Sequence, residues 1–501
     1  MVLTTLLEGV RVVKLYSSFF GRMVLTQDIS VREIRYDSRK VGPGDMFVAL
    51  RGTSVDGHRF IDDVIAAGAV VVVVDDEAAR PDTLFMHAGV VKIVVPDTRV
   101  ALARMASNFY GRPSEALTVV GVTGTNGKTT TTHLVRGVLE ANGQPAGLIG
   151  TIEYRIGEKT IPATHTTPES LELNQLLGDM IKGGCTAAVM EVSSHALVMH
   201  RVEGLRFAAG VFTNLTQDHL DFHGTMESYF EAKKMLFDSL APAAVAVVNL
   251  DNVYGKQIAG GTRGRVVTYG TGSGAEVRGT EIAMDIRGLR MVVKHAGTAT
   301  EVRSPLTGKF NVENILAAFA TGVGLGVPMH DISRGIGAVR AVRGRFENIE
   351  SPEGWTAIVD YAHTPDALQH CLQTIREVLP SGRGHRVVTV FGCGGNRDRG
   401  KRPIMGRIAT EMSDVTFVTS DNPRLEDPLA IIDEIMVGIV KEKEVRKEPD
   451  RRAAIRAALT MARSGDVVLV AGKGHETHQV IGTVKEHLDD REEIENYIRG
   501  R

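Results

Sequence analysis

A glycine-rich turn between a predicted strand and a predicted helix is the feature that most constrains how this chain can fold. An apolar, β-branched run from Leu117 to Val122 has the character of a buried strand. A turn follows at residues 124–130, and beyond it one helical face carries Leu134, Val135, Val138 and Leu139. Because glycines let backbone N–H groups surround phosphate oxygens and a helix N-terminus favours anions, this arrangement predicts a phosphate-binding loop in a parallel α/β sheet.

The glycine spacing of this turn departs from the common P-loop pattern. Five residues separate Gly121 from Gly127, and two separate Gly124 from Gly127, where the common pattern has four. The order of strand, turn and helix is nevertheless the expected one, and the alternative is an ordinary strand-to-helix turn. We predict that the loop holds a triphosphate, with Lys128 at the terminal phosphates and the Thr129 hydroxyl on Mg²⁺.

Length and composition limit the other possibilities. The chain has 501 residues, a net charge of −2 and a pI near 6.8. Such a length suggests about three domains, and the balanced charge gives no case for nucleic acid or an anionic membrane. No apolar run approaches the ~20 residues of a membrane span, and we expect no signal peptide. The cysteines 185, 371 and 393 form no disulfide or metal pattern, so a reducing cytoplasm is expected.

Strand-like runs separated by helical patterns occur in three successive regions. The runs are 30–38, 66–75 and 92–95, then 117–122, 187–191, 209–213 and 244–249, then 357–360, 387–391, 415–419 and 467–471. The sequence predicts an α/β fold of three domains, at residues 1–110, 111–344 and 345–501. The central domain would have a P-loop-type parallel sheet and the C-terminal domain a Rossmann-like one. The charged stretch 441–452 is predicted to be a solvated helix face and connector.

Polar residues follow the end of each strand-like run. In the central region these are Glu191, Thr213-Asn214 and Asn249. Because ligands of open parallel sheets bind beyond the carboxyl ends of the strands, these ends predict one shared site. The carboxylate of Glu191 suits Mg²⁺, a hard cation, whereas His219 is a less orthodox ligand.

Basic residues in two later segments need separate consideration. Judged from the residues alone, Lys233 and Lys234 are two solvated lysines on a helix. Arg397 and Arg424 both follow turns in the C-terminal region and are candidates for binding a carboxylate, which arginine does with two hydrogen bonds. A nucleotide domain facing carboxylate binders suggests that ATP activates one acid for attack by a second substrate.

The motifs resemble those of the Mur ligase family over nearly the whole chain and in the family's order. They are Asp37-Ser38-Arg39, Gly124-Thr125-Asn126-Gly127-Lys128-Thr129-Thr130, Thr166-Thr167-Pro168, Glu191-Val192-Ser193-Ser194-His195, residues 214–221, residues 308–314, Gly344-Arg345-Phe346-Glu347 and residues 360–365, followed by the C-terminal segments. The resemblance implies three domains that bind a UDP-sugar, ATP and an amino acid in turn. It also implies that a substrate carboxylate attacks the γ-phosphate and that an amine attacks the resulting acyl phosphate to form an amide.

The resemblance assigns roles to individual residues. The nucleotide side would comprise residues 124–130, Asn314, Arg345 and His363, with Lys128, Lys233 and His219 catalytic. The metal ligands would be Thr129, Glu191, His219 and Lys233, the last as a carbamate. The UDP-MurNAc-dipeptide would be held by Tyr36, Ser38, Thr53, Ser54, Val55, Thr166, Thr167, Ser193, Met199 and Arg201, where Met199 replaces a glutamine that is common in relatives.

The added amino acid is the most specific implication. Arg397, Asp421, Asn422, Pro423, Arg424, Gly472 and Glu476 match the family's pocket for meso-diaminopimelate. Arg424 can bind the distal carboxylate that lysine lacks, and Glu476 can pair with the distal ammonium. Relatives that add lysine lack this arginine.

Two other functions were weighed. One is a folylpolyglutamate-synthase-like ligase, which shares the loop but lacks the full N-terminal domain and the 421–424 segment. The other is a nucleotide-regulated binding protein without catalysis, against which stand Lys128, Glu191, His219 and Lys233 together. We expect small-molecule substrates, ATP and Mg²⁺, no nucleic acid, no membrane insertion and a monomer.

Overall fold

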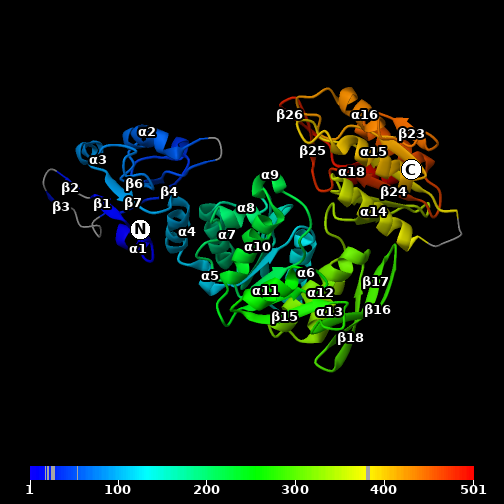
Figure 1. Ribbon diagram of the computed structural model, residues 1–501, viewed down its shortest axis with the longest axis horizontal. Helices are drawn as coiled ribbons and strands as arrows, with labels where there is room; N and C mark the ends of the chain where they lie inside the picture. Colours follow the sequence, from blue (N-terminus) through cyan, green and yellow to red (C-terminus); the bar gives the residue numbers. More distant parts are fainter. Residues whose placement is uncertain (17, 20–21, 24–28, 53–54, 380–383, 501) are drawn as a thin grey trace. The chain divides into compact units, whose positions relative to one another are not determined.

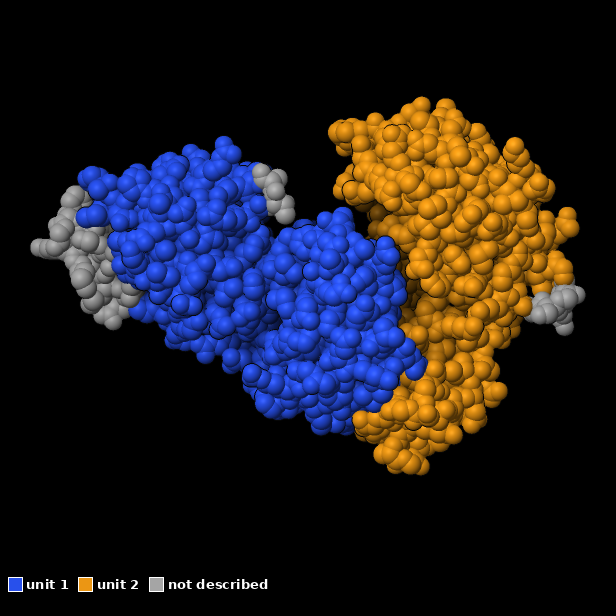
Figure 2. Space-filling view, viewed as in Figure 1, with its two compact units in different colours: residues 1–128, 139–269, 320–327 blue, residues 129–138, 270–319, 328–501 orange. Residues whose placement is uncertain are grey.

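The computed structural model describes residues 1–16, 18–19, 22–23, 29–52, 55–379 and 384–500. The chain forms two compact units, coloured in Figure 2: residues 1–128, 139–269 and 320–327, and residues 129–138, 270–319 and 328–501. Helices alternate with strands in both units (Figure 1), and parallel pairs predominate in the first unit and at the centre of the C-terminal sheet. The predicted α/β class is confirmed.

The N-terminal sheet has the strand order β1-β7-β6-β5-β4, of which β4 to β7 are parallel. Its strands are β1 (Lys14–Tyr16), β4 (Ile34–Arg35), β5 (Met46–Val48), β6 (Val71–Val74) and β7 (Val91–Val94), beside the hairpin β2 (Ser18–Phe19) and β3 (Arg22–Met23). Its helices are α1 (Leu3–Leu6), η2 (Ser38–Lys40), η3 (Gly57–Phe60), α2 (Ile61–Ala66), α3 (Asp82–Ala88) and α4 (Thr98–Phe109). Every residue of β6 is buried, as in a parallel sheet covered on both faces.

The central sheet within the first unit has the order β11-β10-β9-β12-β8-β13-β14-β15. Its strands are β8 (Thr118–Thr123), β9 (Ala146–Ile149), β10 (Glu153–Ile156), β11 (Lys159–Pro162), β12 (Ala187–Glu191), β13 (Ala209–Phe212), β14 (Val245–Asn249) and β15 (Arg265–Gly270). The helices between them are α5 (Pro113–Ala116), α6 (Lys128–Ala141), α7 (Ser170–Lys182), α8 (Ser194–Val198), α9 (Leu220–His223), α10 (Met226–Asp238) and α11 (Gly255–Gly261). The strands β12, β8, β13 and β14 are parallel neighbours, so their carboxyl ends meet at one edge as predicted.

The second unit contains an antiparallel ribbon that was not predicted. It consists of β16 (Val277–Asp285), β17 (Gly288–His295) and β18 (Thr298–Ser304), and the chain continues into α12 (Lys309–Gly324) and α13 (Met329–Ala338). Buried and more exposed residues alternate along β17. That period of two is the signal by which the strand could have been found.

The C-terminal sheet has the order β19-β20-β24-β21-β22-β23. Its strands are β19 (Glu347–Glu350), β20 (Thr356–Asp360), β21 (Val387–Phe391), β22 (Val415–Val418), β23 (Glu444–Lys447) and β24 (Val467–Ala471), and β25 (His478–Ile481) pairs with β26 (Val484–His487) as a hairpin. Its helices are α14 (Pro365–Val378), α15 (Lys401–Met412), α16 (Pro428–Met436), α17 (Arg451–Met461) and α18 (Asp490–Arg499).

The prediction for residues 441–452 was wrong. This stretch contains β23, a strand parallel to β22 at the edge of the sheet, and the start of α17. An edge strand leaves much of its surface in solvent, and charged residues there discourage pairing with other chains. The charges therefore mark a sheet edge and not a connector.

Arg451, from the same stretch, lies in the interior and ties two strand ends together. It forms an ion pair with Asp490 at 2.7 Å, and both side chains are 0% exposed. Its guanidinium also donates to the carbonyl oxygen of Ser420 at 3.4 Å and to that of Ala471 at 3.0 Å. The pair thus fixes the loops that leave β22 and β24.

We predict that Arg451→Met strongly destabilises the second unit, because it leaves the Asp490 carboxylate buried without a counter-charge. Breaking such a pair costs about 3–5 kcal/mol, which lowers the thermal midpoint by roughly 10 °C for a domain of about 150 residues. Differential scanning calorimetry measures the change. The control is Arg446→Met, which removes an exposed pair with Glu444 and should change stability by less than about 1 kcal/mol. Equal shifts in the two variants would contradict the role assigned to Arg451.

Candidate active site

The predicted phosphate loop has a backbone that suits glycine at two positions. Gly124 has φ 151° and Gly127 has φ 84°, values that side chains disfavour. A Cβ on Gly124 would lie 1.8 Å from Oγ1 of Thr213. The loop therefore approaches the neighbouring strand end so closely that only glycine fits.

The end of β13 holds the loop in shape. The N–H groups of Thr125 and Asn126 donate to the carbonyl oxygen and to Oδ1 of Asn214, each at 2.9 Å. Oγ1 of Thr213 donates to the carbonyl oxygen of Asn126 at 2.6 Å. The sequence predicted Thr213 and Asn214 only as polar residues at a strand end. They can hold the loop by hydrogen bonds because β13 pairs directly with β8, the strand that precedes the loop.

Two lysine side chains donate to the carbonyl oxygen of Gly124. Nζ of Lys128, the first residue of α6, lies 2.8 Å from this oxygen and 2.8 Å from that of Thr125. Nζ of Lys233 lies 2.8 Å from the same oxygen of Gly124. Two amines thus converge on the loop at a helix N-terminus, which is where an anion binds favourably.

Lys233 is buried, so the interpretation from residues alone as a solvated lysine was wrong. Its side chain projects from α10, is 1% exposed, and lies over the ring of Tyr229 with Nζ 4.4 Å from the centroid. The next residue, Lys234, pairs with Asp238 at 2.7 Å near the surface. Burial, reinforced by the positive charge of Lys128, holds the pKa of Lys233 well below its ordinary value.

Glu191 ends β12 and is 1% exposed. Its Oε1 accepts from the N–H of Thr151 at 2.8 Å and its Oε2 from Oγ1 of Thr151 at 3.0 Å. A Cβ on Gly150 would lie 2.6 Å from Oε1. The carboxylate is therefore held in one orientation by the loop after β9.

A group of residues predicted for the acid substrate lies next to Glu191. Oγ1 of Thr166 contacts that of Thr151 at 3.0 Å, and Oγ1 of Thr167 donates to the carbonyl oxygen of Glu191 at 2.9 Å. Thr167 also accepts from the N–H of Ser193, whose hydroxyl caps α8. The structure thus brings Thr166, Thr167 and Ser193 together.

Arg201 and Met199 belong to the same surroundings. Arg201 donates to the carbonyl oxygen of Thr167 at 2.9 Å, and its Nε lies 3.4 Å from Oε2 of Glu169. The sulfur of Met199 lies 3.6 Å from Nη2 of Arg201. Glu169 was not predicted, and it also pairs with Arg99 of α4 at 3.3 Å.

The predicted residues of the N-terminal region are partly described. The hydroxyl of Tyr36 donates to Oε1 of Glu172 at 2.8 Å, and burial, with this partner, raises the pKa of Tyr36. Ser38 begins η2, and Val55 is 48% exposed. Thr53 and Ser54 lie outside the described residues.

His219 lies in a group of aromatic rings. It has φ 51°, and its ring centroid is 5.1 Å from that of His195 and 6.3 Å from that of Tyr229. His195 packs against Phe222 at 4.0 Å, and burial, with the charge of His219, lowers the pKa of His195. The sequence did not predict that the ring of His195 lies beside that of His219. The signal was its place in the motif at residues 191–195, two residues after Ser193.

The predicted nucleotide-side residues of the second unit form hydrogen bonds with the start of α6 or with the segment after β20. Nη2 of Arg345 lies 3.5 Å from Oγ1 of Thr129, and its guanidinium lies 5.0 Å from the centroid of Tyr361. Oδ1 of Asn314 accepts from Thr131 at 3.3 Å. Nδ1 of His363 lies 2.8 Å from the carbonyl oxygen of Tyr361.

The predicted amino-acid pocket is a connected group at the ends of β22 and β24. Nδ2 of Asn422 donates to Oε2 of Glu476 at 2.8 Å. A Cβ on Gly472 would lie 2.7 Å from Oδ2 of Asp421, so the two strand ends approach closely. Arg424 has φ 53° and donates from Nη1 to the carbonyl oxygen of Gly395 at 2.9 Å.

Arg397 lies at the exposed edge of this group: a Cβ on Gly394 would lie 2.8 Å from Nη1 of Arg424 and 3.8 Å from Cγ of Arg397. It is exposed, and among the described residues it forms no hydrogen bond or ion pair. Lys473, in contrast, was not singled out from the sequence. It is 0% exposed and donates to both Asn422 and Glu476.

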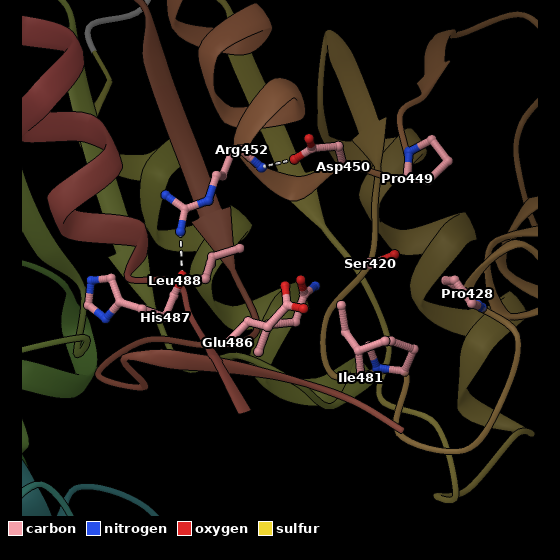
Figure 3. Close-up of a pocket in the computed structure, with 11 residues that line it drawn as sticks. Ser420, Pro428, Pro449, Asp450, Arg452, Ile481, Glu486, His487 and Leu488 are labelled. Carbon is pink, nitrogen blue, oxygen red and sulfur yellow. Dashed lines mark hydrogen bonds between the residues drawn. The ribbon is translucent and has the colours of Figure 1, made fainter. Parts of the chain in front are cut away.

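A pocket of about 370 Å³ adjoins the 421–424 segment, and Ser420 and Pro423 line it (Figure 3). Asp450 accepts from the N–H of Arg452 at 2.8 Å, and the Arg452 guanidinium donates to the carbonyl oxygen of His487. These paired groups connect the start of α17 to the hairpin β25–β26.

Among the residues that the structure describes, no helix is long and apolar enough to cross a membrane. No group of three or more His, Cys, Asp and Glu side chains in this part of the chain is arranged to hold a metal ion.

Comparison with known proteins gives matches along the chain. The Mur ligase family catalytic domain matches residues 30–110, the Mur ligase middle domain residues 122–322, and the Mur ligase glutamate ligase domain residues 344–474. A protein of Geobacter metallireducens named UDP-N-acetylmuramoyl-L-alanyl-D-glutamate–2,6-diaminopimelate ligase is 47% identical, with 93% of this chain and 94% of the relative covered.

Solved structures agree with these matches. A structure of a UDP-N-acetylmuramoyl-L-alanyl-D-glutamate–2,6-diaminopimelate ligase superposes with a TM-score of 0.70 and 33% identity, covering 95% of this chain and 96% of that one. A Mycobacterium tuberculosis folylpolyglutamate synthase has a TM-score of 0.61 and 18% identity, covering 75% and 92% of the two chains, and shares the fold alone.

A glycine loop before a helix and a second α/β domain carrying charged strand-end loops define an acid–amino-acid ligase of three-domain α/β architecture. The chain belongs to the Mur ligase family.

We predict that Lys233→Met is more stable than the unsubstituted protein near neutral pH in bicarbonate-free buffer. The folded-state pKa of Lys233 is depressed, so the unfolded chain binds more protons, and stability rises as pH approaches ~10.4. The substitution removes this cost, while Lys128 continues to donate to the oxygen of Gly124. Thermal midpoints should differ most at about pH 7 and converge at about pH 10.

Lys234→Met is the matched control, because it removes only an (i, i+4) surface pair with Asp238. Such pairs contribute about 0.3–0.5 kcal/mol, so this variant should be slightly less stable. A lower midpoint for Lys233→Met than for the control at every pH would contradict the depressed pKa.

Proposed function

We propose that the chain is an ATP-dependent ligase that adds meso-2,6-diaminopimelate to UDP-N-acetylmuramoyl-L-alanyl-D-glutamate in peptidoglycan precursor synthesis. The observation that carries the proposal is that Asn422 contacts two oppositely charged side chains, the Glu476 carboxylate and the Arg424 guanidinium. It donates to Glu476 at 2.8 Å, and its carbonyl oxygen lies 3.5 Å from Nη1 of Arg424. A cation and an anion so placed suit the distal ammonium and carboxylate of diaminopimelate.

We assign one substrate to each domain, as in the family. We propose domains at residues 1–110 for the UDP-sugar, 111–344 for ATP and 345–501 for the amino acid. The UDP-MurNAc-dipeptide would be held by Tyr36, Ser38, Thr53, Ser54, Val55, Thr166, Thr167, Ser193, Met199 and Arg201. The protein would act in the cytoplasm as a monomer on small molecules.

The first chemical step would be phosphoryl transfer. An oxygen of the D-glutamate carboxylate attacks the γ-phosphorus of ATP, the bond to the β-phosphate oxygen breaks, and ADP leaves. Catalysis of this kind depends on positioning and charge neutralisation. The backbone N–H groups of residues 124–130 and the Lys128 amine would supply both, with Asn314, Arg345 and His363 on the nucleotide side.

The second step would form the amide. The deprotonated amine attacks the carbonyl carbon of the acyl phosphate, and phosphate leaves from the tetrahedral intermediate. Asp421, Asn422, Pro423, Arg424, Gly472, Glu476 and Arg397 would hold the incoming amino acid. Lysine has no distal carboxylate, so it would leave Arg424 without its partner, which disfavours lysine.

The donor set around the loop fits Mg²⁺ if Lys233 is modified. The Thr129 hydroxyl and the Glu191 carboxylate are hard oxygen donors, and His219 would add an imidazole. A lysine amine offers no oxygen, whereas a carbamate offers two. When bound, Mg²⁺ would neutralise phosphate charge. Lys233 can form the carbamate because burial depresses its pKa, so the neutral amine can attack CO₂ with loss of a proton.

Three alternatives make different predictions from this proposal. The same chemistry with L-lysine is opposed by Arg424, and a folylpolyglutamate-synthase-like activity would require turnover of a folate. A nucleotide-regulated binding protein would release no phosphate in response to substrates. One phosphate-release assay with each amino acid or folate distinguishes all of them.

We predict that phosphate release requires UDP-MurNAc-dipeptide and meso-diaminopimelate, with L-lysine at least about 100-fold less effective. Arg424→Ala should lower kcat/KM for diaminopimelate by about 10- to 100-fold, the value of charged hydrogen bonds, with little change in KM for ATP. Arg407→Ala, an exposed arginine of α15, is the control and should retain activity. Equal turnover of lysine and diaminopimelate by the unsubstituted enzyme would refute the assignment.

We predict that activity falls in CO₂-free buffer and is restored by bicarbonate, because carbamate formation at Lys233 requires CO₂. Lys233→Met should be inactive with or without bicarbonate, and Lys234→Met should keep the bicarbonate response. Native mass spectrometry should detect one added carboxyl in the active enzyme and none in Lys233→Met. Full activity without CO₂ would exclude the carbamate.

A further inference from the structure

Lys473 is a buried cation that connects three segments of the C-terminal domain. It follows β24 and is 0% exposed. Its amine donates to Oε2 of Glu476 at 3.0 Å, to Oδ1 of Asn422 at 3.2 Å and to the carbonyl oxygen of His478 at 2.6 Å. Three acceptors use all three of its N–H donors.

Asn422 completes a closed group with Lys473 and Glu476. Its Nδ2 donates to Oε2 of Glu476 at 2.8 Å, and its Oδ1 also accepts from the N–H of Val480 at 2.9 Å. Both bonds to the Glu476 carboxylate thus reach Oε2. No hydrogen bond among the described residues involves Oε1, which keeps its accepting capacity for a ligand.

We propose that Lys473 is a positioning residue for the amino-acid substrate: it fixes Glu476 through Oε2 so that Oε1 is presented to the substrate's distal ammonium. This inference rests on the proposed function. The amine lies too deep to act as a direct ligand, and its effect would pass through Glu476. Without Lys473, only Asn422 would orient the carboxylate.

The charge of Lys473 also governs the ionisation of Glu476. Burial raises the pKa of Glu476, but the charge of Lys473 and the bonds from Asn422 and Lys473 outweigh it, so the pKa lies below its ordinary value. The other charged or titratable groups that interact with this carboxylate are His475, His478, Tyr361 and Arg451. Removing Lys473 leaves burial largely unopposed, and the pKa should then rise.

The test is Lys473→Met in the full-length enzyme, with steady-state kinetics for each substrate. KM for meso-diaminopimelate should rise by about tenfold or more, as for the loss of a hydrogen bond to a charged group. The values of kcat and of KM for ATP and UDP-MurNAc-dipeptide should change less than about threefold. In the variant, KM for diaminopimelate should begin to rise at a higher pH than in the unsubstituted enzyme as the pH is lowered, because the pKa of Glu476 is higher without Lys473.

A double-mutant cycle separates positioning from a general structural effect. In a Glu476→Gln background, Lys473→Met should add less than about twofold to KM for diaminopimelate, because the residue acts through Glu476. Additive effects would overturn the inference. The control is Lys485→Met, at an exposed lysine of the hairpin β25–β26. Its KM for diaminopimelate should equal that of the unsubstituted enzyme.

Failure of the proposed function and failure of the inference about Lys473 give different results. If the unsubstituted enzyme does not use diaminopimelate, the proposed function fails. If it does, but KM for diaminopimelate is unchanged in Lys473→Met, only this inference fails. Should Lys473→Met not fold, Lys473→Leu carries the same test, because leucine also lacks a donor to Oε2 of Glu476, and an unchanged KM there would equally overturn the inference.

Discussion

The carbonyl oxygen of Gly124 accepts hydrogen bonds from the amines of Lys128 and Lys233, each at 2.8 Å, and the rest of the site depends on this convergence. Gly124 can occupy its position only because it lacks a side chain that would collide with Thr213. Burial lowers the pKa of Lys233, and the positive charge of Lys128 lowers it further. A bound polyanion would favour the charged form of both amines, so the loop suits a negative charge that the chain itself does not supply.

The C-terminal pocket differs from the loop because it contains both positively and negatively charged side chains. There Lys473 and Arg424 are interleaved with Glu476 and Asp421, and Asn422 connects them. Opposite charges compensate within the pocket, which suits a ligand carrying both an ammonium and a carboxylate. The contrast between a loop lined by two amines and a pocket of alternating charge agrees with a nucleotide at the loop and a zwitterionic amino acid at the pocket.

The fold was predictable where burial is complete and less so where strands are half exposed. The run 187–191 coincides with β12, because a parallel strand covered on both faces is continuously apolar. The strands β16 to β18 and β23 carry polar and charged residues and so lack such runs. Their positions depend on pairing with neighbours, which apolar runs alone do not reveal.

The two buried lysines show where reasoning from residue types reaches its limit. From the sequence alone Lys233 is a solvated residue of a helix and Lys473 is a polar residue after a strand-like run, yet their surroundings give them different chemistry. Lys473 has three oxygen acceptors, one of them a carboxylate, so its protons are all engaged. Lys233 has one carbonyl oxygen and an aromatic face, a poor environment for a cation that leaves its nitrogen available for reaction. What each lysine does is thus decided by the oxygens that folding brings within reach, and one acceptor of each, Asn422 for Lys473 and Gly124 for Lys233, comes from a segment distant in the sequence.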